Sequence, residues 1–159
     1  MGSLLPTLTC LAALGSGLMA GFFFAFSACV MWALGRIQPA SGIAAMQAIN
    51  VAALRPAFFG VFTGTAAVCA VVVVGSLVDW DDASPYLLIG ALLYLLGAFG
   101  LTGGYHVPRN EALDQVEPSS PDAPDHWTRY VREWTTWNHV RGMAALAAAA
   151  LLTIALHVG

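Results

Sequence analysis

Four long apolar runs limit what this chain of 159 residues can fold into. A helix needs about 20 apolar residues to cross the hydrocarbon core of a bilayer. Runs of this kind cover residues 4–32, 57–78, 86–107 and 138–158. Because every backbone polar group must be paired inside a bilayer, each run is expected to form a helix. The sequence therefore predicts one all-α domain over residues 1–159, an integral membrane four-helix bundle.

The composition agrees with a membrane protein and argues against several other classes. Hydrophobic residues make up 58% of the chain and charged residues 9%, whereas soluble chains average roughly 25% charged. The net charge of −3 gives no reason to expect a nucleic-acid partner. The three cysteines lie in apolar runs, without a close-spaced metal pattern. The N-terminus lacks a basic region and a clear cleavage site, so the first run is expected to be a retained helix.

Small residues recur along two of the predicted spans. In the first span they fall at every fourth position: Ala13, Gly17, Gly21, Ala25 and Cys29. Gly60 and Gly64 form a similar pair in the second span. Small residues at this spacing let two membrane helices approach closely. The contact could lie inside one bundle or between protomers, so a homo-oligomer stays open.

Local signals predict where the connecting segments begin and end. Ser41 is a candidate N-cap for a short helix over residues 42–54. Because Pro56 follows Arg55, Arg55 is expected to be non-helical or to lie at a kink. Pro108 is expected to end or kink the third helix. Asp125 is expected to cap a long fourth helix. Because its first half is polar, this helix should extend beyond the bilayer, partly on the cytoplasmic side.

The arginines predict an orientation in the cell membrane. They occur only between the first and second spans and between the third and fourth: Arg36, Arg55, Arg109, Arg129, Arg132 and Arg141. Cytoplasmic segments of membrane proteins are enriched in arginine and lysine. Both termini are therefore expected outside the cytoplasm.

This orientation brings polar and aromatic residues from three segments to one end of the bundle. The group consists of Asn50, Arg55, His106, Asn110, Tyr130, Trp134, Trp137, Asn138, His139 and Arg141. Polar groups at bilayer depth are costly unless they pair or line a cavity. The sequence therefore predicts a pocket. The alternative is an aromatic belt at the membrane surface, with Arg141 reaching the headgroups.

The residue types in this group indicate what such a pocket could bind. Arg141 could pair with an anionic oxygen, and Asn50, Asn110 and Asn138 could bond to a phenol or carbonyl.

The remaining members suit a flat ligand and proton transfer. Tyr130, Trp134 and Trp137 could stack on an aromatic ring. Histidine is the residue type most often used as a general base, so His106 and His139 are candidates for that role. Copper or haem bound by the two histidines is an alternative.

Three motifs resemble those of the anthrone-oxygenase-like membrane proteins. The first is Met46-Gln47-Ala48-Ile49-Asn50, which precedes Arg55-Pro56. The second is Val107-Pro108-Arg109-Asn110-Glu111-Ala112-Leu113. The third is Trp134-Thr135-Thr136-Trp137-Asn138-His139-Val140-Arg141. The resemblance covers nearly the whole chain and implies a four-helix membrane fold. It matches Asn50, Asn110, Trp137, Asn138 and Arg141, with the two histidines beside the motifs.

The same resemblance implies oxidation of an anthrone to an anthraquinone by dioxygen. An anthrone is flat, apolar and soluble in a membrane, and its enolate can reduce dioxygen without a cofactor. Arg141 would then stabilise the enolate, His106 or His139 would act as base, and the aromatic residues would form walls. Two alternatives remain: a metal- or haem-dependent oxidase at the same site, and a non-enzymatic protein that binds a small ligand or a partner subunit.

Overall fold

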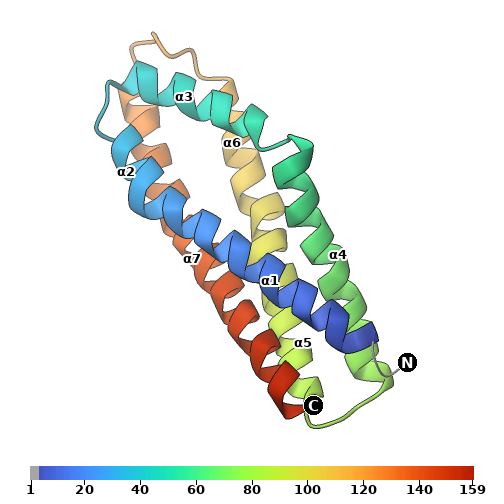
Figure 1. Ribbon diagram of the computed structural model, residues 1–159. Helices are drawn as coiled ribbons and strands as arrows, with labels where there is room; N and C mark the ends of the chain where they lie inside the picture. The colour runs from blue at the N-terminus through green and yellow to red at the C-terminus, as the bar shows by residue number, and fades with distance from the viewer. Residues whose placement is uncertain (1–3) are drawn as a thin grey trace.

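The computed structural model describes residues 4–159, and within this part all the regular secondary structure is helical, with no strand. The elements are α1 (Leu4–Ala25), η1 (Phe26–Val30), α2 (Met31–Leu34), α3 (Pro39–Ala52), α4 (Pro56–Val78), α5 (Ser84–Leu92), η2 (Leu93–Gly100), η3 (Thr102–His106), α6 (Val107–Asp114) and α7 (Ala123–Val158). The three η segments are π-helical turns. They lie inside longer helices, so α1 continues into α2 and α5 continues into α6 (Figure 1).

Four helical units are long and apolar enough to cross a membrane: Leu4–Leu34, Pro56–Val78, Ser84–Asp114 and Ala123–Val158. The prediction of an all-helical protein with four such units is therefore confirmed. They pack side by side, with α7 against α1 and α5, and α4 against the same two helices. The shorter α3 crosses one end of this assembly (Figure 1). The start of α1 and the end of α7 lie together at the opposite end (Figure 1).

The polar end of the molecule has a hydrophobic core of its own. Trp127, Tyr130 and Trp134 of α7 are buried there together with Met46 of α3 and Leu113 of α6. Gln47 also links α3 to the end of α6. Its amide nitrogen donates to the carbonyl oxygens of Leu113 at 3.0 Å and Val116 at 3.1 Å. Carbonyls at a helix end lack partners within the helix, so this contact fixes α3 across the bundle.

Two helix starts differ from the sequence predictions. α3 begins at Pro39 after Gln38, so Ser41 is not its N-cap. A proline in the first turn fits because its fixed φ suits a helix and its missing N–H needs no partner there. α7 begins at Ala123 after Asp122, and Asp125 lies in its first turn instead of capping it.

Pro108 does not end the third helix, which was one of the two outcomes predicted for it. The chain stays helical from Ser84 to Asp114, and Pro108 lies in the first turn of α6, directly after the π-helical turn η3. A π-helical turn already interrupts the regular hydrogen-bond ladder, so a proline is tolerated beside it. Arg55, by contrast, is extended as expected, with φ −65° and ψ 146°, and α4 starts at Pro56.

The close helix contacts coincide only in part with the predicted glycines. A Cβ atom at Gly17 would lie 3.9 Å from the Cβ atom of Ala149 on α7, an ordinary packing contact. A Cβ atom added at Gly60 or Gly64 would meet nothing within 4 Å, so this pair is not a packing site within the chain. A Cβ atom at Gly97 of η2, however, would lie 2.5 Å from the Cβ atom of Ala144 on α7. The third and fourth membrane units therefore touch where Gly97 leaves room.

Gly97→Ala should lower the stability of the folded protein, because the new methyl group overlaps Ala144 and overpacking typically costs about 1–3 kcal/mol. The matched control Gly64→Ala adds the same methyl group in open space. It should be neutral or raise stability by up to about 1 kcal/mol through helix propensity. Thermal unfolding in detergent, followed by circular dichroism, measures both variants. Equal melting temperatures for the two variants would contradict the packing described.

Candidate functional site

A cavity of about 500 Å³ lies beneath α3, between α1, α4 and the helical unit that ends in α6. Its wall is mainly aromatic and includes Phe22, Phe23, Phe26, Phe58, Phe59, Phe62, Phe99 and Trp134. Four residues bring polar groups to it: Asn50, Thr102, Asn110 and Arg141. A mostly apolar cavity with a few convergent polar groups is the usual form of a small-molecule site.

Arg141 places a buried positive charge at this cavity. Its side chain is 6% exposed, and its guanidinium lies over the rings of Phe23 at 4.2 Å and Trp134 at 5.0 Å. Its Nε donates to Asn138 Oδ1 at 2.8 Å, and its Nη1 donates to Thr102 Oγ1 at 3.0 Å. These partners are neutral, and the ion pair found among residues 4–159 joins Arg109 to Glu133 instead. A buried charge without a counter-ion favours an anionic ligand.

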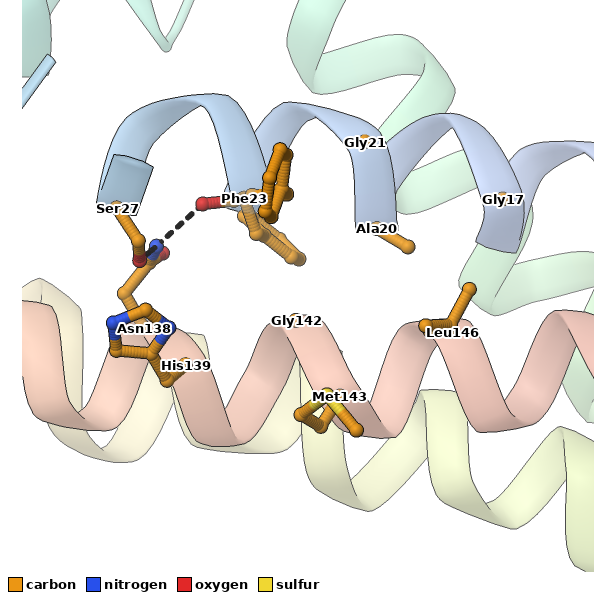
Figure 2. Close-up of a pocket in the computed structure, with 11 residues that line it drawn as sticks. Gly17, Ala20, Gly21, Phe23, Ser27, Asn138, His139, Gly142, Met143 and Leu146 are labelled. Carbon is orange, nitrogen blue, oxygen red and sulfur yellow. Dashed lines mark hydrogen bonds between the residues drawn. The ribbon is translucent and has the colours of Figure 1, made fainter. Parts of the chain in front are cut away.

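Asn138 faces α1 and not the cavity. Its Nδ2 donates to the Phe23 carbonyl oxygen at 2.7 Å (Figure 2) and to Ser27 Oγ at 2.6 Å. Its Oδ1 accepts from Arg141. The amide is fully buried, and these three bonds use both its hydrogens and its oxygen. Asn138, which the sequence suggests as a ligand contact, is therefore seen holding Arg141.

Asn110 is held by two aromatic residues of α7. Its Oδ1 accepts from Tyr130 Oη at 2.8 Å and from Trp134 Nε1 at 3.1 Å. An indole N–H can only donate, so the amide oxygen must face Trp134 and the amide nitrogen must point elsewhere. Asn110 lines the cavity, as does Asn50, whose buried Nδ2 has no hydrogen-bond partner of standard geometry, although the side chain of Tyr130 lies nearby. This end of the wall therefore has amide donors available for an acceptor oxygen.

Six of the residues suggested by the sequence lie outside this cavity. Two of them, Asn138 and Tyr130, bond to residues that line it, namely Arg141 and Asn110.

Three others are exposed. Trp137 is 39% exposed and packs on Tyr105, with ring centroids 4.8 Å apart. Arg55 is exposed at the start of α4. His139 is exposed and lines a separate groove of about 330 Å³ between α1 and α7 (Figure 2).

His106 is the sixth, and it is 1% exposed. Its ring packs edge-on against Trp134, with centroids 5.2 Å apart. Neither ring nitrogen has a hydrogen-bond partner of standard geometry, although the backbone of Leu101 and Trp134 lies nearby. His106 therefore does not line the cavity itself but packs against Trp134, which does.

The two histidines do not come together at one site. His106 is buried behind Trp134, whereas His139 opens onto the groove at α1. Within residues 4–159 there is no cluster of three or more His, Cys, Asp or Glu side chains arranged to hold a metal ion. The geometry therefore gives no support for copper or haem bound by His106 and His139.

Ser27 and Thr102 are site residues that the sequence reasoning missed. Each lies in a π-helical turn, Ser27 in η1 and Thr102 in η3. Such turns occur frequently at functional sites, because the extra residue changes which side chains face inward. The available signal was the chemistry alone, namely a hydroxyl inside an otherwise apolar run.

The fold and the site define a helical membrane protein with a buried arginine at an aromatic cavity. The sequence profile of the anthrone oxygenase family matches residues 57–151. The chain therefore belongs to this family, and the resemblance noted in the sequence is confirmed. No curated protein and no solved structure gives a significant match. The matched range contains Asn110, Trp134, Asn138 and Arg141, whereas Asn50 and the α1 residues precede it.

Trp134→Phe should weaken the binding of a flat, unreactive ligand such as 9,10-anthraquinone by about 2- to 10-fold, since an aromatic contact is worth about 0.5–1.5 kcal/mol. Trp137→Phe should weaken it by less than twofold, because the Trp137 indole is half exposed and packs on Tyr105. Equilibrium binding in detergent micelles measures both dissociation constants. A larger loss for Trp137→Phe than for Trp134→Phe would place the ligand elsewhere.

Proposed function

We propose that this protein is a membrane oxygenase that oxidises a flat, anthrone-type phenolic substrate with dioxygen. The observation that carries the proposal is the guanidinium of Arg141, buried without a carboxylate partner at an aromatic cavity. The family match supports the same chemistry. An apolar substrate would reach the cavity from the bilayer, where it is soluble.

The proposed reaction begins with removal of a proton from the methylene carbon opposite the ketone of the anthrone. The ketone oxygen then becomes an enolate oxygen, and Arg141 stabilises this developing charge. Fixed donors aimed at a developing oxyanion are among the strongest contributions to enzyme catalysis. The aromatic walls hold the ring system flat beside the guanidinium.

The remaining steps need only dioxygen. The enolate transfers one electron to dioxygen, and the resulting radical combines with superoxide to form a carbon–oxygen bond. Protonation gives a hydroperoxide, which loses water and leaves a second ketone. The balance is one anthrone and one dioxygen to one anthraquinone and one water. The reduction of dioxygen consumes four electrons, and its two oxygen atoms end in the new ketone and in water. All four electrons come from the methylene carbon, so no separate reductant enters.

His106 is the proposed proton acceptor. Its ring contacts Trp134, which lines the cavity, and its nitrogens have no hydrogen-bond partner of standard geometry. A small shift of Trp134 or a single water would connect it to the substrate. His139 opens onto the other side of α7 and has no such route.

We further propose that the cavity end faces the cytoplasm in the cell membrane. Besides Arg141, five arginines are carried by the segments at that end, and the opposite end has none: Arg36, Arg55, Arg109, Arg129 and Arg132. This distribution agrees with the tendency of cytoplasmic segments to be positively charged.

Arg141→Ala should lower oxygen uptake with anthrone by about 100-fold or more, the usual effect of losing an oxyanion-stabilising donor. Arg141→Lys should recover part of the rate, because it keeps the charge but cannot reproduce both hydrogen bonds. Arg36→Ala is the matched control, since Arg36 is exposed and stacks on Trp32. Full activity in Arg141→Ala would contradict the proposal. Tight ligand binding without oxygen uptake by the unmodified protein would support a binding protein instead.

His106→Ala should lower kcat for anthrone oxidation more than His139→Ala does, by about 100-fold if His106 supplies general-base catalysis. Steady-state oxygen uptake at several anthrone concentrations gives kcat and KM for both variants. A greater loss of kcat in His139→Ala would move the reacting centre to the groove between α1 and α7.

A further inference from the structure

A continuous chain of buried hydrogen bonds runs from α1 to the guanidinium of Arg141. Ser27 Oγ and the Phe23 carbonyl oxygen both accept from Asn138 Nδ2, and Asn138 Oδ1 accepts from Arg141 Nε. Figure 2 shows the amide of Asn138 directed at this part of α1. The chain links two helices that are more than 100 residues apart in the sequence.

The partners of Asn138 determine which way its amide points. The Phe23 carbonyl can only accept and the Nε–H of Arg141 can only donate, so the amide nitrogen must face α1 and the amide oxygen must face Arg141. The hydroxyl of Ser27 in η1 accepts the second N–H of the amide and holds it in this orientation. Ser27 therefore influences the guanidinium without touching it.

Ser27 does not line the cavity. It lies in η1 and borders the groove on the other side of Asn138. Phe23 connects the two sides, because its carbonyl oxygen accepts from Asn138 while its ring lies 4.2 Å from the guanidinium carbon. A substitution at Ser27 therefore changes the support of Arg141 while leaving the residues around the substrate in place.

We propose that Ser27, through Asn138, is a positioning residue that fixes the guanidinium of Arg141 in the orientation the proposed enolate requires. The claim that Ser27 orients the guanidinium stands on the hydrogen bonds alone. The claim that this orientation matters for catalysis rests on the proposed function. A hydroxyl at this one point of α1 thus orients a charge on α7, and Thr102 holds the other side of the same guanidinium.

The orientation is tested first without any activity measurement. In protein labelled with ¹⁵N-arginine, six arginines give six Nε–H signals, and Arg141→Lys identifies that of Arg141. Its hydrogen exchange should be slow and should become faster on the order of tenfold in Ser27→Ala, as one buried hydrogen bond is lost. Ser27→Thr, which keeps the hydroxyl, should restore slow exchange.

Ser16→Ala is the matched control for this measurement. Ser16 is buried on the same helix, roughly 16 Å further along its axis. It should leave the Arg141 signal unchanged. If Ser16→Ala and Ser27→Ala speed the exchange equally, or if neither changes it, Ser27 does not position Arg141 and the proposal is overturned.

The catalytic consequence is tested by a double-mutant cycle. Ser27→Ala should lower kcat for anthrone oxidation on the order of tenfold with little change in KM, and Ser27→Thr should restore it. In an Asn138→Ala background, Ser27→Ala should have less than a twofold further effect, because the link to Arg141 is already cut. The same factor in both backgrounds would show that Ser27 acts through packing alone.

The two measurements separate failure of the inference from failure of the proposed function. If the unmodified protein shows no oxygen uptake with anthrone, the proposed function fails, and the exchange data still decide whether Ser27 orients Arg141. If uptake is normal and Ser27→Ala changes neither exchange nor kcat, the function stands and the inference fails.

Discussion

The burial of one unpaired guanidinium is the constraint on which the rest of this structure depends. Removing a charge from water without a counter-ion is strongly unfavourable. Here the charge of Arg141 is offset by neutral acceptors on Asn138 and Thr102 and by the faces of Phe23 and Trp134. A carboxylate at this point would neutralise the charge. The arrangement instead keeps the positive charge available to the cavity.

Each group that surrounds Arg141 is placed by packing elsewhere in the protein. The contact at Gly97 brings the third membrane unit close to α7. The π-helical turns carry Ser27, which bonds to Asn138, and Thr102, which bonds to Arg141 itself. At the end of the molecule where the cavity lies, Gln47 bonds to the end of α6 and thereby holds α3 over the cavity. The fold thus supplies a rigid and largely apolar setting, in which a single charge has a large effect.

Much of this arrangement could be predicted from the sequence, and the reasons are physical. The apolar runs are long and almost free of charge, so their helical state follows from the bilayer. Asn50, Asn110, Trp134 and Arg141 stood out because polar groups beside apolar runs need partners, and all four line the cavity. Trp137 and His139, which were predicted for the same pocket, do not line the cavity. They flank Asn138 in the sequence, and because each step along a helix turns about 100°, they point in other directions. The buried stripe of α7 passes through Trp134, Asn138 and Arg141 and leaves its neighbours outside.

Other features depend on three-dimensional packing and leave no local signal. The π-helical turns have no sequence period of their own, so neither Ser27 nor Thr102 could be assigned to a site from spacing. Gly60 and Gly64 have the spacing of a packing pair, yet both face open space. Small residues at this spacing permit a close helix contact but do not ensure that one forms.

The central claim is that Arg141 stabilises an oxyanion in the cavity, and the ionisation of a bound phenol tests it most directly. A hydroxyanthraquinone changes colour when its phenol loses a proton, so its pKa can be read by absorbance in the bound state. The ligand bound to the unmodified protein should ionise at a pH at least about one unit lower than when bound to Arg141→Met, as expected for an opposite charge within about 4–6 Å. Equal pKa values for the ligand in the two proteins would contradict the account.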